Sequence, residues 1–299
     1  MPNKGRLLEG KNCIITSGAH GMGYSIARLF ALQGARVAVC GRSAAGVRSG
    51  EELAALSPGS FFFQCDMGEA DQVKAFADEA IERFGTVDVL VNNVGVNLKQ
   101  KIKDIDMEVY DWIQRVNLTA SVLMLQKVLP NMLDNGIHGS VIHISSMNAL
   151  SPSPTTAAYS ASKGGVISLS LVLSTEVGKY GIRSNVICPG WVATSYIADE
   201  VRKAAEEGRS VYEAVGAYDG TSPLMAPGRP SDIANHALFL ASDMSSYITG
   251  AVIRADGSSV MQAHACEFPG PPQEQALKRA YYDSILEECG LDTWKNRGI

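Results

Sequence analysis

Short apolar runs alternate with longer helical patterns along most of the chain. The runs are rich in β-branched and aromatic residues and are continuous, which is typical of parallel strands covered on both faces. This alternation predicts a Rossmann-like, doubly wound parallel α/β sheet with helices on both faces. The pattern predicts strands at 12–16, 36–40, 61–65, 87–91, 140–145, 183–188 and 251–255, and helices near 22–33, 69–84, 105–134, 156–180 and 231–242.

Two segments break the alternation of strands and helices. Residues 195–228 form a long excursion between the sixth and seventh strands, and residues 258–299 follow the last strand. In the second segment, apolar residues recur at four-residue spacing before Gly290, which predicts a helix near 272–289. We therefore expect one Rossmann-type domain over residues 1–257 and a C-terminal extension.

Composition and charge narrow the class of protein. The chain has 299 residues, of which 46% are hydrophobic, and a net charge of −5, which argues against nucleic-acid or anionic-membrane partners. No apolar run is long enough to span a membrane and the N-terminus lacks a signal-peptide core, so we expect a soluble, cytoplasmic protein. The six cysteines include no C-x-x-C pair and are interpreted as small buried hydrophobes. Neither they nor the histidines suggest a metal site.

A glycine-rich turn follows the first predicted strand. Gly18, Gly21 and Gly23 allow a tight turn and a close approach of the backbone to a ligand. The amides that open the next helix then face a pyrophosphate, so the turn predicts a dinucleotide site. The alternative is an ordinary strand–helix turn that happens to be rich in glycine.

The end of the second strand bears on cofactor choice. An acidic side chain there binds the ribose 2′-hydroxyl of NAD, whereas this chain has Gly41 followed by Arg42. A guanidinium suits a 2′-phosphate in charge and geometry, which favours NADP(H) over NAD(H). His20 and Arg48 are further candidates for the phosphate. The alternative is that Arg42 is a solvated surface residue.

Tyr159 and Lys163 lie one helical turn apart, and the spacing alone is not specific. A nearby ammonium is expected to lower the pKa of the phenol and make it a proton donor near neutral pH. Ser146, at the end of the fifth strand, is placed to bind the same substrate oxygen, and Ser145 replaces it if the register slips by one residue. His143, inside an apolar run, is interpreted as a core histidine rather than a base.

A series of motifs occurs in order along the chain: "TSGAHGMG" (16–23), "CDM" (65–67), "NNVG" (92–95), "RVNLTA" (115–120), "HISS" (143–146), "YSASK" (159–163), "NVICPGWVAT" (185–194) and "FLASDMSSYITGAVIRADG" (239–257). Together they resemble the short-chain dehydrogenase/reductase family, in its compact, single-domain Tyr-x-x-x-Lys branch. The resemblance extends from about residue 8 to about residue 257.

The resemblance implies catalytic roles for four residues. Tyr159 corresponds to the acid/base, and Lys163 lowers its pKa and holds the nicotinamide ribose. Ser146 polarises the substrate carbonyl. Asn117 interrupts its helix and holds a water that connects Lys163 to solvent, although the residue also fits a plain helix-surface amide.

The resemblance also implies a set of cofactor contacts. In it, Asp66 meets the adenine, and the segment after the sixth strand clamps the nicotinamide. The chain departs from the family pattern at Ser17 and Ser258, where glycine is usual, and at Val94, where alanine is usual. The cofactor-binding set is Ser17, Gly18, His20, Gly21, Met22, Gly23, Gly41, Arg42, Asp66, Met67, Asn93, Val94, Gly95, Tyr159, Lys163, Pro189, Gly190, Val192 and Thr194.

The excursion at 195–228 corresponds to the substrate lid of the family and is apolar and aromatic. It predicts a bulky hydrophobic substrate such as a hydroxysteroid, bile acid or polyphenol, unless these residues only pack the lid onto the body. Relatives usually form homodimers or homotetramers through the helices at 105–134 and 156–180. The expected substrate-binding residues are Val96, Met147, Leu150, Trp191, Tyr196, Tyr212 and Tyr218.

The sequence therefore predicts an NADP(H)-dependent oxidoreductase that interconverts a secondary alcohol and a ketone by hydride transfer. One alternative is an NAD(H)-dependent dehydrogenase of a smaller alcohol or sugar-like substrate. A second is an epimerase or dehydratase that uses the same tyrosine and lysine with bound cofactor. A third, from another class, is a non-catalytic dinucleotide sensor.

Overall fold

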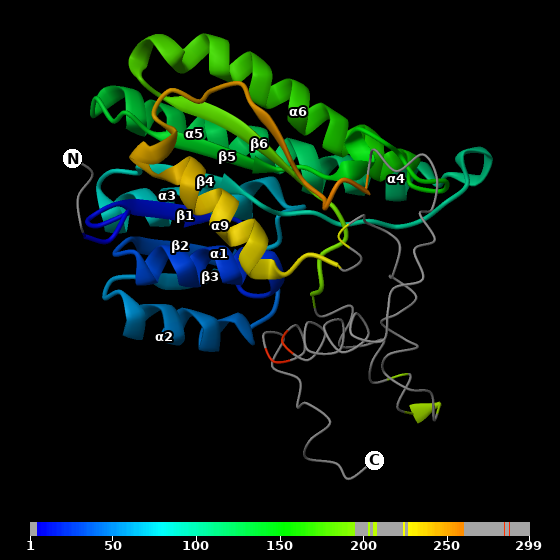
Figure 1. The fold of residues 1–299 in the computed structure, drawn as a ribbon, viewed down its shortest axis with the longest axis horizontal. Coiled ribbons are helices and arrows are strands. Elements are labelled where there is room, and N and C mark those ends of the chain that lie inside the picture. The colour runs from blue at the N-terminus through cyan, green and yellow to red at the C-terminus, as the bar shows by residue number, and fades with distance from the viewer. Residues whose placement is uncertain are drawn as a thin grey trace.

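The computed structural model describes residues 5–194 and 227–259, together with positions 203, 206, 207, 224, 284 and 287. Within this part, seven parallel strands form one sheet in the order β3-β2-β1-β4-β5-β6-β7 (Figure 1). The predicted Rossmann-like fold is confirmed, and each predicted strand is present to within two residues at either end. The strands are β1 (Asn12–Ile15), β2 (Arg36–Gly41), β3 (Phe61–Gln64), β4 (Val89–Asn92), β5 (Ser140–Ile144), β6 (Arg183–Pro189) and β7 (Val252–Ala255).

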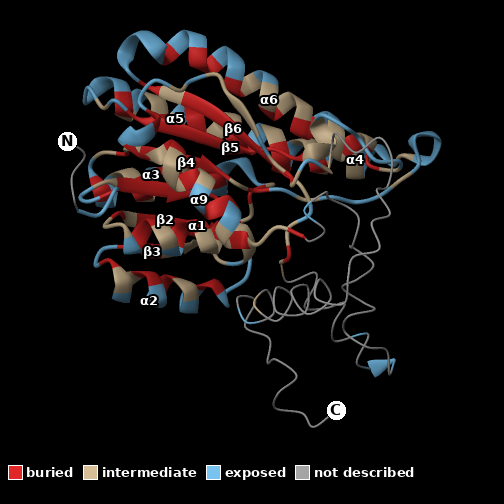
Figure 2. Ribbon diagram, viewed as in Figure 1, coloured by how far each residue is buried: buried red, intermediate tan, exposed pale blue. Residues whose placement is uncertain are grey.

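Helices cover both faces of the sheet, so most strand residues are buried (Figure 2). One apolar layer packs α3, α5 and α6 against the sheet, and the other packs α1, α2 and α9. Strands enclosed in this way need apolar side chains on both faces, which explains their continuous apolar runs. The helices are α1 (Gly21–Leu32), α2 (Gly46–Leu56), α3 (Ala70–Phe84), α4 (Met107–Gln114), α5 (Ala120–Asp134), α6 (Ala157–Val177) and α9 (Pro230–Ala241).

The single helix predicted at 105–134 is instead two helices joined by a π-helical turn. The turn spans Arg115–Thr119 and separates α4 from α5. It places the buried side chain of Asn117 against the backbone of Val96. A bulge of this kind is invisible to a helical periodicity, although the resemblance implies an interruption at Asn117.

Helix α2 was not predicted, because its sequence contains two glycines, which disfavour helix formation. Those glycines accommodate the ring of Phe62 in the neighbouring β3. A Cβ at Gly50 would lie 2.7 Å from the Cβ of Phe62, and a Cβ at Gly46 would overlap the ring. The close approach of α2 to β3 therefore outweighs the low helix propensity.

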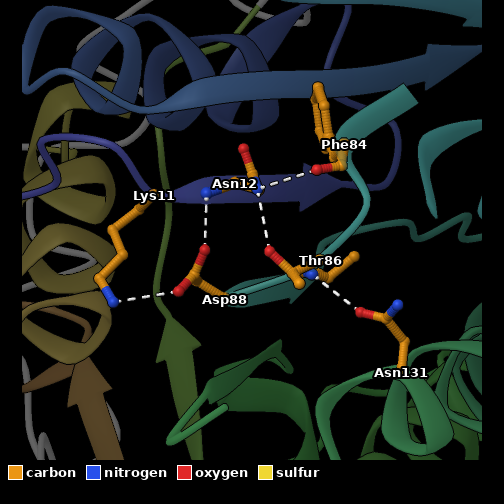
Figure 3. Close-up of polar contacts among 7 residues, drawn as sticks. Lys11, Asn12, Phe84, Thr86, Asp88 and Asn131 are labelled. Atoms are coloured by element: carbon orange, nitrogen blue, oxygen red, sulfur yellow. Dashed lines mark hydrogen bonds and ion pairs between the residues drawn. The ribbon is translucent and has the colours of Figure 1, made fainter. Parts of the chain in front are cut away.

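The amino ends of β1 and β4 are joined by a polar network (Figure 3). The Asn12 side chain donates to the Phe84 carbonyl at 3.5 Å and the Thr86 hydroxyl at 3.3 Å. Its Oδ1 accepts from Nε of Arg36 at 2.9 Å, and its backbone N–H donates to Asp88 at 2.9 Å. Both ends of the buried amide are therefore paired.

Three further contacts complete this network, and Figure 3 shows the first two. Lys11 forms an ion pair with Asp88 at 3.0 Å. Oδ1 of Asn131, on α5, accepts from the backbone N–H of Val87 at 2.9 Å, and its amide donates to the Gly85 carbonyl at 2.9 Å. The turn between α3 and β4 is thus attached to both β1 and α5.

The predicted lid and C-terminal extension lie mostly outside the described residues. This holds for the helix predicted near 272–289, of which only Ser284 and Glu287 are described. The Ser284 hydroxyl accepts from Nη2 of Arg229 at 2.6 Å, just before α9. None of the described helices is long and apolar enough to cross a membrane.

Candidate active site

The glycine-rich turn runs from β1 into α1 along the carboxyl edge of the sheet. Ser17 has a φ of 53°, in the left-handed region that glycine adopts most readily. Its backbone N–H points to Sγ of Cys40 at 3.5 Å, and the next N–H, of Gly18, donates to the Cys40 carbonyl at 3.0 Å. A Cβ at Gly18 would lie 2.7 Å from Cγ1 of Val39, so the turn packs tightly on β2.

Asn93, directly after β4, fastens this turn. Its side-chain amide donates to the carbonyls of Thr16 at 3.0 Å and Ser17 at 3.2 Å. The Thr16 hydroxyl accepts in return from the backbone N–H groups of Asn93 at 2.9 Å and Val94 at 3.1 Å. A Cβ at Gly23 would lie 2.5 Å from Nδ2 of Asn93, so this packing requires the glycine.

A pocket of about 360 Å³ opens beside the glycine-rich turn. Eight predicted cofactor residues line it: Ser17, His20, Gly41, Arg42, Asp66, Met67, Val94 and Gly95. Val96, predicted to bind substrate, also lines it. The lining residues that sequence reasoning missed are Ala19, Ser43, Ala45, Gly46, Cys65, Trp112 and Val116. Ser43, Ala45 and Gly46 follow Arg42 closely in the sequence, which is the signal that would have found them.

Arg42 and Asp66, the cation and the carboxylate of this pocket, come from the ends of β2 and β3. Arg42 and Ser43 are exposed at its edge, and the Arg42 carbonyl accepts from Gln64 at 2.9 Å. The Asp66 carboxylate accepts from the Gly68 N–H at 2.8 Å. Cation and carboxylate thus stand at different parts of one cavity, as a bound nucleotide with a phosphate and a base would require.

Ser145 and Ser146 point in different directions from the end of β5. Ser145 donates to the backbone carbonyl of Lys163 at 2.8 Å. Ser146 accepts from the Asn148 N–H at 3.1 Å, and its hydroxyl is hydrogen-bonded to that of Tyr159. Ser146, and not Ser145, therefore faces the tyrosine.

The ammonium of Lys163 is buried between two carbonyl oxygens. Nζ donates to Val94 at 3.0 Å and to Ile144 at 2.9 Å. Burial lowers the pKa of Lys163 to about 8, and a charge on Cys188 itself partly opposes this shift. A Cβ at Gly95 would lie 2.9 Å from Nζ, so this glycine leaves room for the amine.

The expected lowering of the Tyr159 pKa by Lys163 is wrong for this structure. Burial raises the pKa of Tyr159, and the hydrogen bond with Ser146 opposes that rise without cancelling it. The reason is that the ammonium of Lys163 is directed to the backbone carbonyls of Val94 and Ile144. Desolvation of the phenol therefore dominates.

Asn117 interrupts its helix, and its side chain is fully engaged. Oδ1 accepts from the Val96 N–H at 2.8 Å, and Nδ2 donates to the Val96 carbonyl at 3.0 Å and the Ser162 hydroxyl at 2.9 Å. The amide thus joins α4, α5 and α6 to the loop after β4. Its predicted link to a water remains a prediction.

Sequence comparison decides the family. Residues 18–258 match the family described as Enoyl-(Acyl carrier protein) reductase. A solved short-chain type dehydrogenase/reductase from Mycobacterium marinum is 30% identical, with a TM-score of 0.73, over 84% of this chain and 96% of that one. This chain belongs to the short-chain dehydrogenase/reductase family. The resemblance drawn from the motifs is therefore confirmed. This chain is an oxidoreductase, and its family binds NAD(P)(H).

Curated relatives of this short-chain dehydrogenase/reductase carry several activities. The 3-oxoacyl-(acyl-carrier-protein) reductase FabG of Thermotoga maritima is 33% identical over 85% of this chain and 99% of its own length. The L-rhamnose 1-dehydrogenase (NAD(P)(+)) of a Sphingomonas species is 33% identical, over 84% and 97%. The glucose 1-dehydrogenase of Gluconobacter oxydans is 34% identical, over 86% and 94%.

The segment after β6 packs against the end of β7 and the start of α1. Pro189 ends β6, and a Cβ at Gly190 would lie 2.7 Å from Cα of Asp256. Val192 forms an isolated bridge with Gly228. Cγ2 of Thr194 would lie 3.7 Å from a Cβ at Gly21, so this segment passes over the start of α1. The remaining predicted contact, Met22, packs against the core beneath α1.

The predicted substrate residues are only partly described. Met147 is half-buried, and its sulfur lies 3.5 Å from the Ser259 hydroxyl. Leu150 and Trp191 are 42% and 39% exposed. Tyr196, Tyr212 and Tyr218 lie outside the described residues. The described apolar residues therefore leave the predicted substrate class open.

Proposed function

We propose that this short-chain dehydrogenase/reductase is an NADP(H)-dependent enzyme that interconverts a secondary alcohol and a ketone by hydride transfer. The observation that carries the proposal is the hydrogen bond between Ser146 and Tyr159, with buried Lys163 one turn along the same helix. Donors fixed in this way are suited to an oxygen that gains negative charge.

The dinucleotide supplies or accepts the hydride when it is bound. In reduction, the Tyr159 hydroxyl gives its proton to the oxygen that was the carbonyl, while the Ser146 hydroxyl stabilises the developing charge. Lys163 and Asn117 hold the surrounding backbone in place. The raised pKa of Tyr159 keeps the phenol protonated at neutral pH, which favours reduction. Oxidation needs the phenolate, so its kcat/KM is expected to rise with pH.

The pocket fits the adenosine half of a dinucleotide. It adjoins the glycine-rich turn, and the cavity of about 360 Å³ reaches from Asp66 to Arg42. We assign Arg42, with Ser43 and His20 nearby, to a 2′-phosphate, and Asp66 to the adenine. A planar guanidinium pairs with phosphate through two parallel hydrogen bonds, which supports NADP(H) over NAD(H).

The test is a fluorescence titration of the protein with NADPH and, separately, with NADH. Arg42→Ala is expected to weaken NADPH binding about 10- to 100-fold, since charge-assisted hydrogen bonds each contribute roughly 1.5–3 kcal/mol. Its effect on NADH should stay within about threefold. Arg6→Ala is the matched control, because Arg6 is exposed, pairs with Glu9 at 2.6 Å and does not line the pocket. Equal or tighter NADH binding by the wild type would refute the cofactor assignment.

For the substrate we propose a bulky hydrophobic alcohol or ketone, supported by the exposed Leu150 and Trp191 beside the cleft. The names of the curated relatives favour a sugar or a carrier-bound acyl substrate instead. A panel containing a hydroxysteroid, a polyphenol ketone, an aldose and a 3-oxoacyl thioester separates these classes. Stoichiometric cofactor turnover on any of them excludes both the epimerase and the sensor alternatives.

We also propose the predicted organisation: one catalytic domain over 1–257, a C-terminal extension, and a cytoplasmic homodimer or homotetramer. Size-exclusion chromatography with light scattering tests the assembly, and a monomer would refute it. A chain ending at residue 259 that folds and binds NADPH would support the domain boundary.

A further inference from the structure

Three sulfur atoms meet beside the dinucleotide pocket. Sγ of Cys40, at the end of β2, lies 3.5 Å from Sδ of Met67, and Sγ of Cys65 lies 3.7 Å from the same atom. The two thiols are also within hydrogen-bond reach of each other. All three residues are buried, so the sulfurs form a closed triangle inside the protein.

The triangle has the dimensions of a three-coordinate metal site. A metal–sulfur bond of about 2.3 Å in a planar trigonal arrangement separates the sulfurs by ~4.0 Å. The two contacts of the Met67 sulfur, at 3.5 and 3.7 Å, need to lengthen by only a few tenths of an ångström to reach this separation. Two thiolates and a thioether are soft donors, which favour Cu(I) over harder cations. Among the described residues, no group of three His, Cys, Asp or Glu side chains offers a competing site.

The residues around the three sulfurs provide a path by which a metal ion can enter and a hydrogen-bond donor for a thiolate. Cys65 and Met67 line the pocket of about 360 Å³, so an ion can reach them from that side. The Ser17 N–H lies 3.5 Å from Sγ of Cys40 and is placed to stabilise a thiolate there. We propose that Cys40, Cys65 and Met67 form a binding site for one Cu(I) ion in the wall of the dinucleotide pocket.

Binding involves no change of oxidation state. Two S–H bonds are replaced by two S–Cu bonds, the thioether of Met67 adds a lone pair, and two protons leave. Because the ligand thiols must lose their protons to bind the ion, Cu(I) affinity is expected to rise with pH.

Metal occupancy is expected to affect the dinucleotide, a consequence that rests on the proposed function. The Cys40 sulfur that would bind the ion also contacts the N–H of Ser17 in the glycine-rich turn. Expansion of the triangle therefore moves the turn, and one Cu(I) should weaken NADPH binding.

The test measures Cu(I) affinity in anaerobic competition with a chromophoric Cu(I) chelator. Cys266 and Cys289 lie outside the described residues, so both are replaced by serine in every protein. This background is expected to bind one Cu(I) and release two protons. Cys40→Ala should weaken binding at least ~100-fold and Met67→Leu about 10-fold, since each removes one soft donor. Cys13→Ala is the matched control, because Cys13 is equally buried on the neighbouring β1.

X-ray absorption on the background protein supplies a readout that needs no variant, and three sulfurs at about 2.3 Å are expected. Unchanged affinity in Cys40→Ala, or an equal loss in Cys13→Ala, overturns the site. A Cys40–Cys65 disulfide with no retained metal does the same. If Cys40→Ala does not fold, Met67→Leu and the absorption spectrum decide. Failure of the metal-free protein to bind NADPH refutes the proposed function and leaves the metal result standing.

Discussion

The two edges of the sheet treat buried polar groups in opposite ways. At the amino edge, the side-chain nitrogen of Asn12 has the partners shown in Figure 3, and its oxygen accepts from Arg36. At the carboxyl edge, Oδ1 of Asn92, Oδ1 of Asn93 and Nε2 of His143 are buried without a protein partner among the described residues. Unpaired buried polar atoms cost stability, so the fold is secured at one edge and bears a cost at the other.

The carboxyl edge also contains the buried titratable groups. His143, on β5, lies beside Asn92 with only a long 3.5 Å contact between their nitrogens. Burial and the charge of Lys163 lower the pKa of His143 to about 3. Neutral His143 and cationic Lys163 are thus both buried at β5, where Lys163 donates to the Ile144 carbonyl. The difference between the edges suggests that instability is concentrated where the proposed chemistry occurs.

The largest expected effect separates chemistry from stability. Tyr159→Phe should lower kcat about 10³-fold, because general acid–base groups contribute roughly 10²–10⁴. Its melting temperature should change little, since Ser146 is the one hydrogen-bond partner of the hydroxyl among the described residues and Tyr159 is half-buried. Tyr180→Phe, at an exposed tyrosine, is the control and should change neither quantity. Retention of more than a tenth of the activity in Tyr159→Phe would remove the tyrosine from the proposed mechanism.

The second prediction concerns the loss of folding stability at acidic pH, to which His143 should contribute. The pKa of His143 is lower in the folded protein, about 3, than its unfolded value of about 6.5. Its contribution to stability is therefore present above pH 6.5 and is lost as the pH falls towards 3, for a total of about 5 kcal/mol. His143→Asn should flatten the fall in unfolding free energy between pH 6.5 and 4.5, measured by urea denaturation. A parallel fall in both proteins would show that acid acts elsewhere.

One substitution made at both edges tests the comparison directly. Asn12→Leu should cost about 3 kcal/mol, because it removes the Asn12 partner of Nε of Arg36 and of the Thr86 hydroxyl. Asn92→Leu should change stability by less than about 1 kcal/mol, since its oxygen has no protein partner to lose. Chemical denaturation of both variants measures the difference. Equal costs would mean that the two edges are energetically alike.

The smallest expected effect concerns backbone strain. Ser17 and Ser258 both stand where the family usually has glycine, and both have positive φ, 53° and 68°. Left-handed geometry costs a non-glycine residue about 1–2 kcal/mol, while glycine costs roughly 0.5–1 kcal/mol through the unfolded chain. Ser17→Gly should therefore stabilise the protein by up to about 1 kcal/mol in thermal unfolding, with Ser258→Gly as the matched comparison. Destabilisation of both would show that their hydroxyls are required.

The pattern of hydrophobic residues along the sequence predicted the sheet well, because strands covered by helices on both faces consist of continuous apolar runs. It also placed Ser146, Tyr159 and Lys163 together, since each follows a strand end or opens a helix at one edge. It missed α2, whose glycines serve contact with Phe62 rather than helix propensity.

Other features of the site depend on packing that no local pattern carries. Trp112 lines the pocket from α4, far along the chain from the glycine-rich turn. The rise in the Tyr159 pKa comes from burial of the phenol. It also reflects the direction of the Lys163 ammonium, which donates to backbone carbonyls. A sequence predicts that the tyrosine and lysine are neighbours, but not where the ammonium points.

The hydrogen bonds from Asn93 to the glycine-rich turn determine when, during synthesis of the chain, the turn can close. Asn93 and Thr16 are 77 residues apart, so joining them costs ~4 kcal/mol in chain entropy. A nascent chain that ends before β4 already contains every glycine of the turn but lacks the amide that holds it closed. The ability to bind a dinucleotide is therefore acquired only after β4 and Asn93 have been made. An isolated fragment of β1, α1 and β2 should not retain it.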